Sequence, residues 1–268
     1  MTDRLRFTIL GCGASPGVPR IGGDWGACDP SNPKNRRRRC SLLAERISAS
    51  GVTRVLVDTS PDLREQSIAA GLSAIDGVLF THPHADHLHG IDDLRGFVLN
   101  MRRRVDIYAD AQTLERLRQA FGYCFETPPG SEYPPLLNAH LIEAGTPVAI
   151  AGAGGALTAL PINQAHGRIN ALAFRIGGLA YSPDVSDLDD EAEYRLQDLD
   201  VWIVDALRHT PHPSHLALHQ TLAWIERLRP RRAVLTHMHV DLDYETLRRS
   251  LPANVEPAYD EMVLELPC

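Results

Sequence analysis

Residues 78–90, VLFTHPHADHLHG, decide how this chain folds and what its centre contains. A short apolar run, typical of a buried strand, leads directly into three histidines and an aspartate within six residues. Alternate side chains of an extended backbone point to one side, so His82 and His84 can bind one metal ion together. Asp86 and His87 follow at the expected start of a helix, where the turning chain can direct them at a second ion. We therefore expect a metal centre here rather than a solvent-exposed, histidine-rich loop.

Strand and helix patterns alternate along the rest of the chain. Short branched apolar stretches bounded by turn signals predict buried strands at residues 7–11, 55–58, 78–80, 105–108, 201–205 and 233–236, and a last strand ending near Leu266. Apolar residues at helical spacing predict helices at residues 61–70, 111–121, 217–228 and 244–251. This order favours an α/β fold with mixed sheets covered by helices.

The composition indicates a globular protein with a sizeable core. The 268 residues are 44% hydrophobic and 23% charged, with a net charge of −7 that disfavours a long nucleic acid as partner. No apolar run is long enough to span a membrane, and charges interrupt the first residues where a signal peptide would be apolar. Five cysteines without CxxC spacing suit reduced thiols. We expect one cytoplasmic domain over residues 1–268, without a membrane partner, and the sequence leaves a homodimer open.

Three segments depart from these patterns. Residues 17–39 and 126–137 are rich in glycine or proline and are expected to be long loops, and the sequence leaves open whether they shape the substrate pocket. Residues 149–156 are expected to form a turn between two strands. The run Arg36 to Arg39 is interpreted as solvated surface, because the chain as a whole is acidic.

The HxHxDH pattern at residues 82–87 resembles the metallo-β-lactamase superfamily at every defined position. The resemblance extends over nearly the whole chain and implies an αββα four-layer sandwich. Family order implies three further ligands after later strands, and His166, Asp184 and His237 stand in that order. The resemblance then implies that one ion is held by His82, His84 and His166, the other by Asp86, His87 and His237, and that Asp184 bridges them.

Further motifs resemble the PhnP-type branch of this superfamily and, more distantly, tRNase Z. They are ILGCGASPGVP at 9–19, NRRRRCS at 35–41, VLVDTSPDLR at 55–64, YSPDVS at 181–186 and SHLALHQTL at 214–222. The branch can hold a structural zinc through cysteines of the early loop, but only Cys28 remains here and Val240 stands at the late partner position. We therefore expect no structural zinc at Cys28.

Some residues outside the expected ligand set also have predicted roles. The resemblance implies that His215 is a catalytic acid that binds no metal, and the alternative is that it caps a helix beginning near Leu216. Arg168, two residues beyond His166, is a candidate for binding a substrate phosphate, with an ordinary surface arginine as the alternative. Asp58 is expected to support the metal-binding loop through hydrogen bonds. Surface or packing roles are expected for His89, His140 and His239.

The function that these features imply is a dinuclear metal-dependent phosphodiesterase. Two divalent transition-metal ions, zinc or manganese, would provide a bridging hydroxide that attacks a small phosphate ester, cyclic or nucleotide-like. One alternative is a tRNA 3′-processing endonuclease, which the acidic composition and the lack of a basic arm disfavour. Another is a catalytically inactive module that binds metal or nucleotide. Hydrolysis of β-lactams is disfavoured because no signal peptide is evident.

Overall fold

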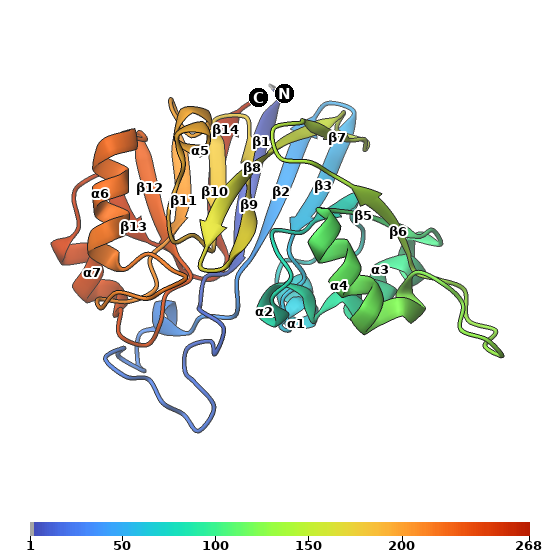
Figure 1. The fold of residues 1–268 in the computed structure, drawn as a ribbon, viewed down its shortest axis with the longest axis horizontal. Coiled ribbons are helices and arrows are strands. Elements are labelled where there is room, and N and C mark those ends of the chain that lie inside the picture. The colour runs from blue at the N-terminus through green and yellow to red at the C-terminus, as the bar shows by residue number, and fades with distance from the viewer. Residues whose placement is uncertain (1–2) are drawn as a thin grey trace.

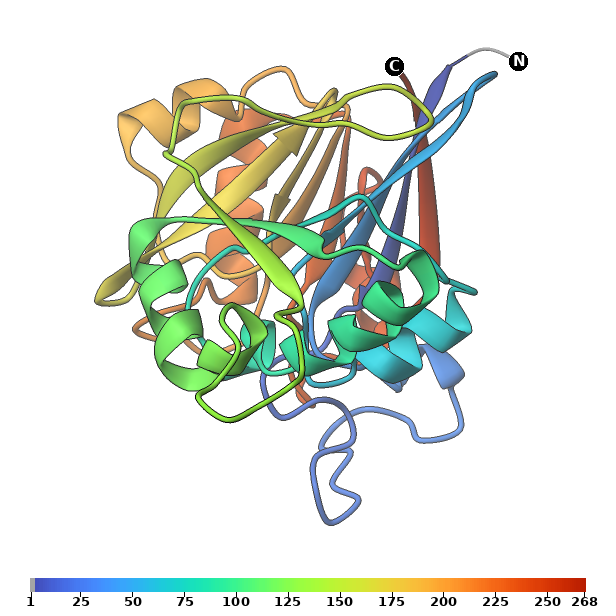
Figure 2. The same cartoon turned by 90° about the vertical axis from the view of Figure 1, so that its right-hand side faces the viewer.

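The computed structural model describes residues 3–268. Two sheets of seven strands pack face to face, and helices cover the outer face of each sheet (Figure 1). The predicted αββα four-layer sandwich is therefore confirmed. Both described ends of the chain lie side by side at one end of the sandwich in both views (Figures 1 and 2).

The first sheet combines an antiparallel half with a parallel half. Strands β14, β1, β2 and β3 pair antiparallel, whereas β3 to β6 pair in parallel. The order across the sheet is β14 (Met262–Pro267), β1 (Arg4–Gly11), β2 (Ser41–Ser48), β3 (Gly51–Val57), β4 (Gly77–Leu79), β5 (Val105–Ala109) and β6 (Leu137–Leu141).

The second sheet also has an antiparallel half and a parallel half. Strands β7 to β10 pair antiparallel and β10 to β13 pair in parallel. The order is β13 (Val255–Pro257), β12 (Arg232–Thr236), β11 (Val201–Asp205), β10 (Leu179–Ser182), β9 (Ile169–Ile176), β8 (Leu157–His166) and β7 (Val148–Ile150). The turn expected at residues 149–156 is shorter than predicted, because β7 includes Ala149 and Ile150.

Two apolar clusters hold the four layers together. The larger cluster lies between the sheets, continues between the second sheet and its helices, and includes the fully buried Phe7, Phe174 and Trp202. The other lies between the first sheet and its helices, around Phe80 and Leu117. Buried side chains alternate with more exposed ones along β1, as expected for a strand with one face toward a core. This rigid double sheet fixes the ends of the strands that carry the candidate site.

The helices lie where their apolar faces can cover the sheets. Helices α1 to α4 cover the first sheet, and α5 to α7 cover the second (Figure 1). Their bounds are α1 (Leu63–Ala69), α2 (Ala85–Leu88), α3 (Leu94–Met101), α4 (Ala111–Phe121), α5 (Asp190–Arg195), α6 (Leu218–Leu228) and α7 (Tyr244–Ser250). Short 3-10 turns are η1 (Pro33–Asn35), η2 (Ile91–Asp93) and η3 (Gly122–Cys124). Among residues 3–268, no helix combines the length and apolar character needed to cross a membrane.

Both predicted long loops are present, with small regular parts. Residues 17–39 project from the end of the sandwich opposite the chain ends and contain η1 (Figure 2). Residues 126–136 connect η3 to β6, which begins at Leu137.

The interpretation of Arg36 to Arg39 as solvated surface is wrong for most of the run. Only Arg36 is exposed, whereas Arg37 has 2% of its surface exposed. Arg38 pairs with Asp260 and Arg39 with Asp62, at 2.9 and 2.8 Å. The net charge of the chain could not reveal this burial and pairing, because the loop at residues 17–39 folds back onto segments far away in the sequence.

Candidate metal centre

The candidate ligands lie where strands of both sheets end. Strand β4 is followed by His82 and His84, β8 ends at His166, β10 is followed by Asp184 and β12 by His237. Helix α2 begins at Ala85, so Asp86 and His87 lie in its first turn, as predicted. Loops at one edge of such sheets commonly form the functional site of α/β proteins.

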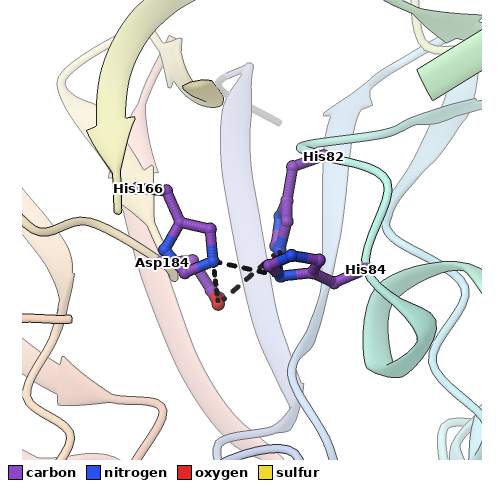
Figure 3. A group of neighbouring side chains, drawn as sticks. All are labelled: His82, His84, His166 and Asp184. Atoms are coloured by element: carbon purple, nitrogen blue, oxygen red, sulfur yellow. Dashed lines mark hydrogen bonds and ion pairs between the residues drawn. The ribbon is translucent and has the colours of Figure 1, made fainter. Parts of the chain in front are cut away.

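A first ligand group consists of His82, His84, His166 and Asp184 (Figure 3). The Nδ1 atom of His84 lies 3.1 Å from Nε2 of His82 and 3.1 Å from Nε2 of His166. The Oδ2 atom of Asp184 is 3.7 and 3.6 Å from those two Nε2 atoms. Three imidazole nitrogens and a carboxylate oxygen thus surround one point.

A second ligand group consists of Asp86, His87 and His237, beside the same aspartate. The Oδ2 atom of Asp86 is 3.5 Å from Nε2 of His87 and 3.6 Å from Nε2 of His237. Asp184 reaches this group as well, with its Oδ1 3.0 Å from His87 and its Oδ2 3.5 Å from His237. Its carboxylate therefore lies between the two groups, where the sequence predicted a bridging ligand.

The chemistry of these donors fits metal ions. Among residues 3–268, the buried Nε2 of His237 has no hydrogen-bond partner and faces the centre. Nε2 of His87 and Oδ1 of Asp184 also face it, and they contact each other at 3.0 Å without the geometry of a hydrogen bond. Buried polar atoms are costly when unpaired, so such a convergence indicates a cation-binding site. Burial lowers the pKa of His166 to about 4, which leaves a neutral ring with a free lone pair. Burial also opposes ionisation of Asp184, but the charges of His237 and His87 hold its pKa well below the usual range.

Protein oxygens orient three of the histidine rings. The Nδ1 atom of His87 donates to Asp58 at 2.6 Å, and that of His82 donates to the Thr81 hydroxyl at 2.9 Å. The Nδ1 atom of His166 donates to the carbonyl of Ser214 at 2.6 Å. Each bond leaves Nε2 free to face the centre, as is usual for metal-binding histidines.

Asp58 has the supporting contacts that the sequence predicted. It is fully buried after β3 and also accepts from the Thr81 amide and hydroxyl, each at 2.8 Å. Its φ of 65° is unusual for a residue other than glycine, and such conformations cluster at functional sites.

His215 lies beside both ligand groups. Its Nδ1 donates to Asp205 at 2.8 Å, and its Nε2 is 3.8 Å from Oδ2 of Asp184. Burial disfavours the charged ring, but the Asp205 carboxylate outweighs this effect and raises the pKa of His215 to about 9. The helix-cap alternative is wrong, because α6 begins at Leu218 with Ala217 as its N-cap.

Sequence reasoning missed three supporting contacts. Asp205 ends β11 and orients His215, and its position after an apolar strand, like that of Asp58, was the available signal. The Ser15 hydroxyl donates to Oδ2 of Asp86 at 2.7 Å, and the carbonyl of Ser214 accepts from His166. Nothing in the local sequence marks these last two contacts, since they depend on distant loops meeting.

The remaining predicted residues lie outside the two ligand groups. Arg168 is exposed in the turn between β8 and β9, so its role in substrate binding stays a prediction. His140 is 2.8 Å from Asp106, and His89 packs edge-on against Phe121 at a centroid distance of 5.5 Å. His239 lies two positions beyond His237 in the sequence, and its Nδ1 is 3.1 Å from Oδ1 of Asp241.

Cys28 belongs to a small apolar cluster with Val18, Trp25 and Val240. Its Sγ lies 3.3 Å from the carbonyl of Val240, and burial raises the pKa of the thiol, so it stays protonated.

We expect the Cys28→Ser variant to keep the metal content of the parent. A hydroxyl can donate to the same carbonyl, and among residues 3–268 Cys28 belongs to no group of side chains placed to hold a metal ion. Elemental analysis of both purified proteins tests this. Loss of one equivalent of zinc from the variant would show that Cys28 is a ligand.

A family model described as a β-lactamase superfamily domain matches residues 53–238. Together with the four-layer sandwich and the histidine-rich centre, this shows that the chain belongs to the β-lactamase superfamily.

Two solved structures indicate which branch of the superfamily this chain resembles. A crystal structure of a diphosphatase from the PhnP family is 34% identical, with a TM-score of 0.88 over 99% of this chain and 98% of that chain. Human tRNase Z, short form, shares the fold, with a TM-score of 0.65, 17% identity and coverage of 98% of this chain and 100% of that chain. The predicted resemblance to the PhnP branch is thereby confirmed.

A curated relative is the octanoyltransferase of Porphyromonas gingivalis, which is 33% identical over 261 residues. The match covers 96% of this chain and 50% of that protein, so this chain spans about half the length of the relative.

Proposed function

We propose that this protein is a dinuclear metal-dependent phosphodiesterase for a small phosphate ester, cyclic or nucleotide-like. The observation that carries the proposal is the convergence of four histidine Nε2 atoms, one histidine Nδ1 and two carboxylates on adjoining points beside His215. In this proposal His82, His84 and His166 hold one ion, Asp86, His87 and His237 hold the other, and Asp184 bridges. Zinc and manganese both suit these nitrogen and oxygen donors.

Two bound ions would supply charge that stabilises the phosphoryl oxygens and would lower the pKa of a water that attacks phosphorus. The residues of the chain supply the geometry. Asp58 and the Ser214 carbonyl fix the rings of His87 and His166, so that the donor atoms are in place before substrate arrives.

His215 is proposed to give a proton to the departing oxygen. Asp205 accepts from Nδ1, which directs the proton on Nε2 toward the centre. The raised pKa of about 9 keeps the ring protonated at neutral pH. Cations held by the neighbouring ligand groups would lower that pKa toward neutrality, where a general acid is most effective.

The similarity to a diphosphatase of the PhnP family supports a small phosphate substrate. It also adds diphosphates to the substrates that should be tested. Attack at phosphorus is common to phosphodiesters and diphosphate bonds, so the same centre suits both. Arg168 is proposed to bind a phosphate oxygen.

A panel of substrates tests the proposal on metal-reconstituted protein. It contains a chromogenic phosphodiester, cyclic nucleotides, a cyclic ribose phosphate, a nucleoside diphosphate ester, a precursor tRNA and a β-lactam. We expect turnover of at least one small phosphate ester, and activity that is lost with chelator and restored by zinc or manganese. Turnover of precursor tRNA alone would favour the endonuclease, and binding of nucleotide without any turnover would favour an inactive module.

A further inference from the structure

A buried arginine connects two segments beside the metal centre. The Nη2 atom of Arg37 donates to the carbonyl of Leu242 at 2.7 Å, and its Nη1 donates to the carbonyl of His239 at 3.4 Å. Nη2 also lies 3.3 Å from Oδ1 of Asn35. Across residues 3–268, Arg37 has no carboxylate at ion-pair distance, so a full charge is buried against neutral acceptors. Burying a charge without an opposite charge is costly, so the guanidinium depends on these neutral acceptors staying in place.

The segment that Arg37 holds follows directly after His237. The early loop, residues 17–39, and Ala14 just before it both contact this segment. The amide of Ala14 donates to the Met238 carbonyl at 3.2 Å, and the amide of Ala27 donates to the Val240 carbonyl at 2.9 Å. Gly26 is packed so closely against Val240 that a Cβ there would lie 2.7 Å from its side chain. Arg37 lies within this clasp, which we define as the contacts between the early loop and residues 238–244.

Within residues 3–268, His237 lacks the side-chain hydrogen bond that orients His82, His87 and His166. The rings of His82, His87 and His166 are fixed by close hydrogen bonds from Nδ1. For His237, the carboxylate of Asp205 is 4.0 Å from Nδ1, which is beyond hydrogen-bond distance. Its φ of 56° is a conformation that persists only when the surroundings impose it.

We propose that Arg37 is a positioning residue for the metal centre, because it fixes the segment that holds His237 in the second ligand group. The inference rests on the proposed role of His237 as a ligand. The planar guanidinium reaches two carbonyls on successive parts of one segment, which an ammonium group cannot do in the same geometry. A role limited to fold stability would affect both ions alike, whereas a positioning role affects the ion beside His237.

The test compares the variants Arg37→Met, Arg37→Lys, His237→Ala and Arg36→Met. Arg36 is exposed in the same run and is the matched control. Metal-free proteins are titrated calorimetrically with zinc and with manganese, and bound metal is measured after dialysis. Amide hydrogen exchange over residues 238–244 is measured on the same metal-free samples, and thermal unfolding checks that each variant folds.

We expect Arg37→Met to lower the affinity for one ion by about 10- to 100-fold, the range seen when groups that support metal ligands are lost. The weakened ion should be the one that His237→Ala also weakens, and the other ion should bind as in the parent. Amide exchange over residues 238–244 should be faster in Arg37→Met than in the parent. Arg37→Lys should recover little of the lost metal affinity, and Arg36→Met should bind metal and exchange as the parent does. Equal weakening of both ions, or unchanged binding and exchange, would overturn the inference. If the parent itself binds fewer than two ions, the proposed centre fails, whereas unchanged exchange in Arg37→Met is failure of the clasp alone.

Discussion

Replacing His82 and His84 together with alanine is expected to abolish hydrolysis of a chromogenic phosphodiester and to remove at least one metal ion per chain. The two rings supply two of the three nitrogen donors of the first ligand group. Without that ion, the attacking water would lose the lowering of its pKa that a bound metal ion supplies. Elemental analysis and initial rates on reconstituted protein measure both effects.

A matched control removes two histidines that lie outside the ligand groups. The double variant His89→Ala, His140→Ala should keep both the ions and the rate, because these side chains contact Phe121 and Asp106. If metal content and rate survive in the His82, His84 variant, the assignment of the first ligand group is wrong.

The His215→Ala variant is expected to lose about 10² to 10⁴ in rate on an alkyl or ribosyl diester, the usual contribution of a positioned general acid. The loss should be much smaller on a nitrophenyl diester, because nitrophenolate departs without a proton. Metal content should equal that of the parent. Asp205→Asn should show the same dependence on the leaving group, since Asp205 orients the ring.

The metal content of the His215→Ala variant matters as much as its rate. Asp184, His215 and His237 form a third grouping that could hold an ion. Loss of one equivalent of metal would make His215 a ligand. Equal losses on both diesters would exclude the transfer of a proton to the leaving group.

Local patterns predicted the parts of the centre that lie close together in sequence. An apolar strand leading into HPHADH placed His82 to His87 at a strand end and a helix start, which β4 and α2 confirm. Helix α4 was predicted at its observed bounds, because the apolar spacing that predicts it is a local property. The distant residues His166, Asp184 and His237 required the family resemblance.

Contacts between distant loops could not be predicted. The burial of Arg37 depends on residues 239 and 242, more than 200 positions away, and a run of arginines looks the same whether solvated or buried. Ser15 reaches Asp86 only because two loops meet at the same end of the sandwich. Such contacts follow from the folded topology, which a local pattern does not contain.

The ratio of metal to protein after reconstitution tests whether the centre holds two ions. Purified protein is stripped with chelator, incubated with zinc or manganese, dialysed and analysed for metal, and the same sample is assayed on a chromogenic phosphodiester. We expect close to two ions per chain and activity that rises as they bind. A ratio near zero, or full activity in the stripped protein, would contradict this expectation.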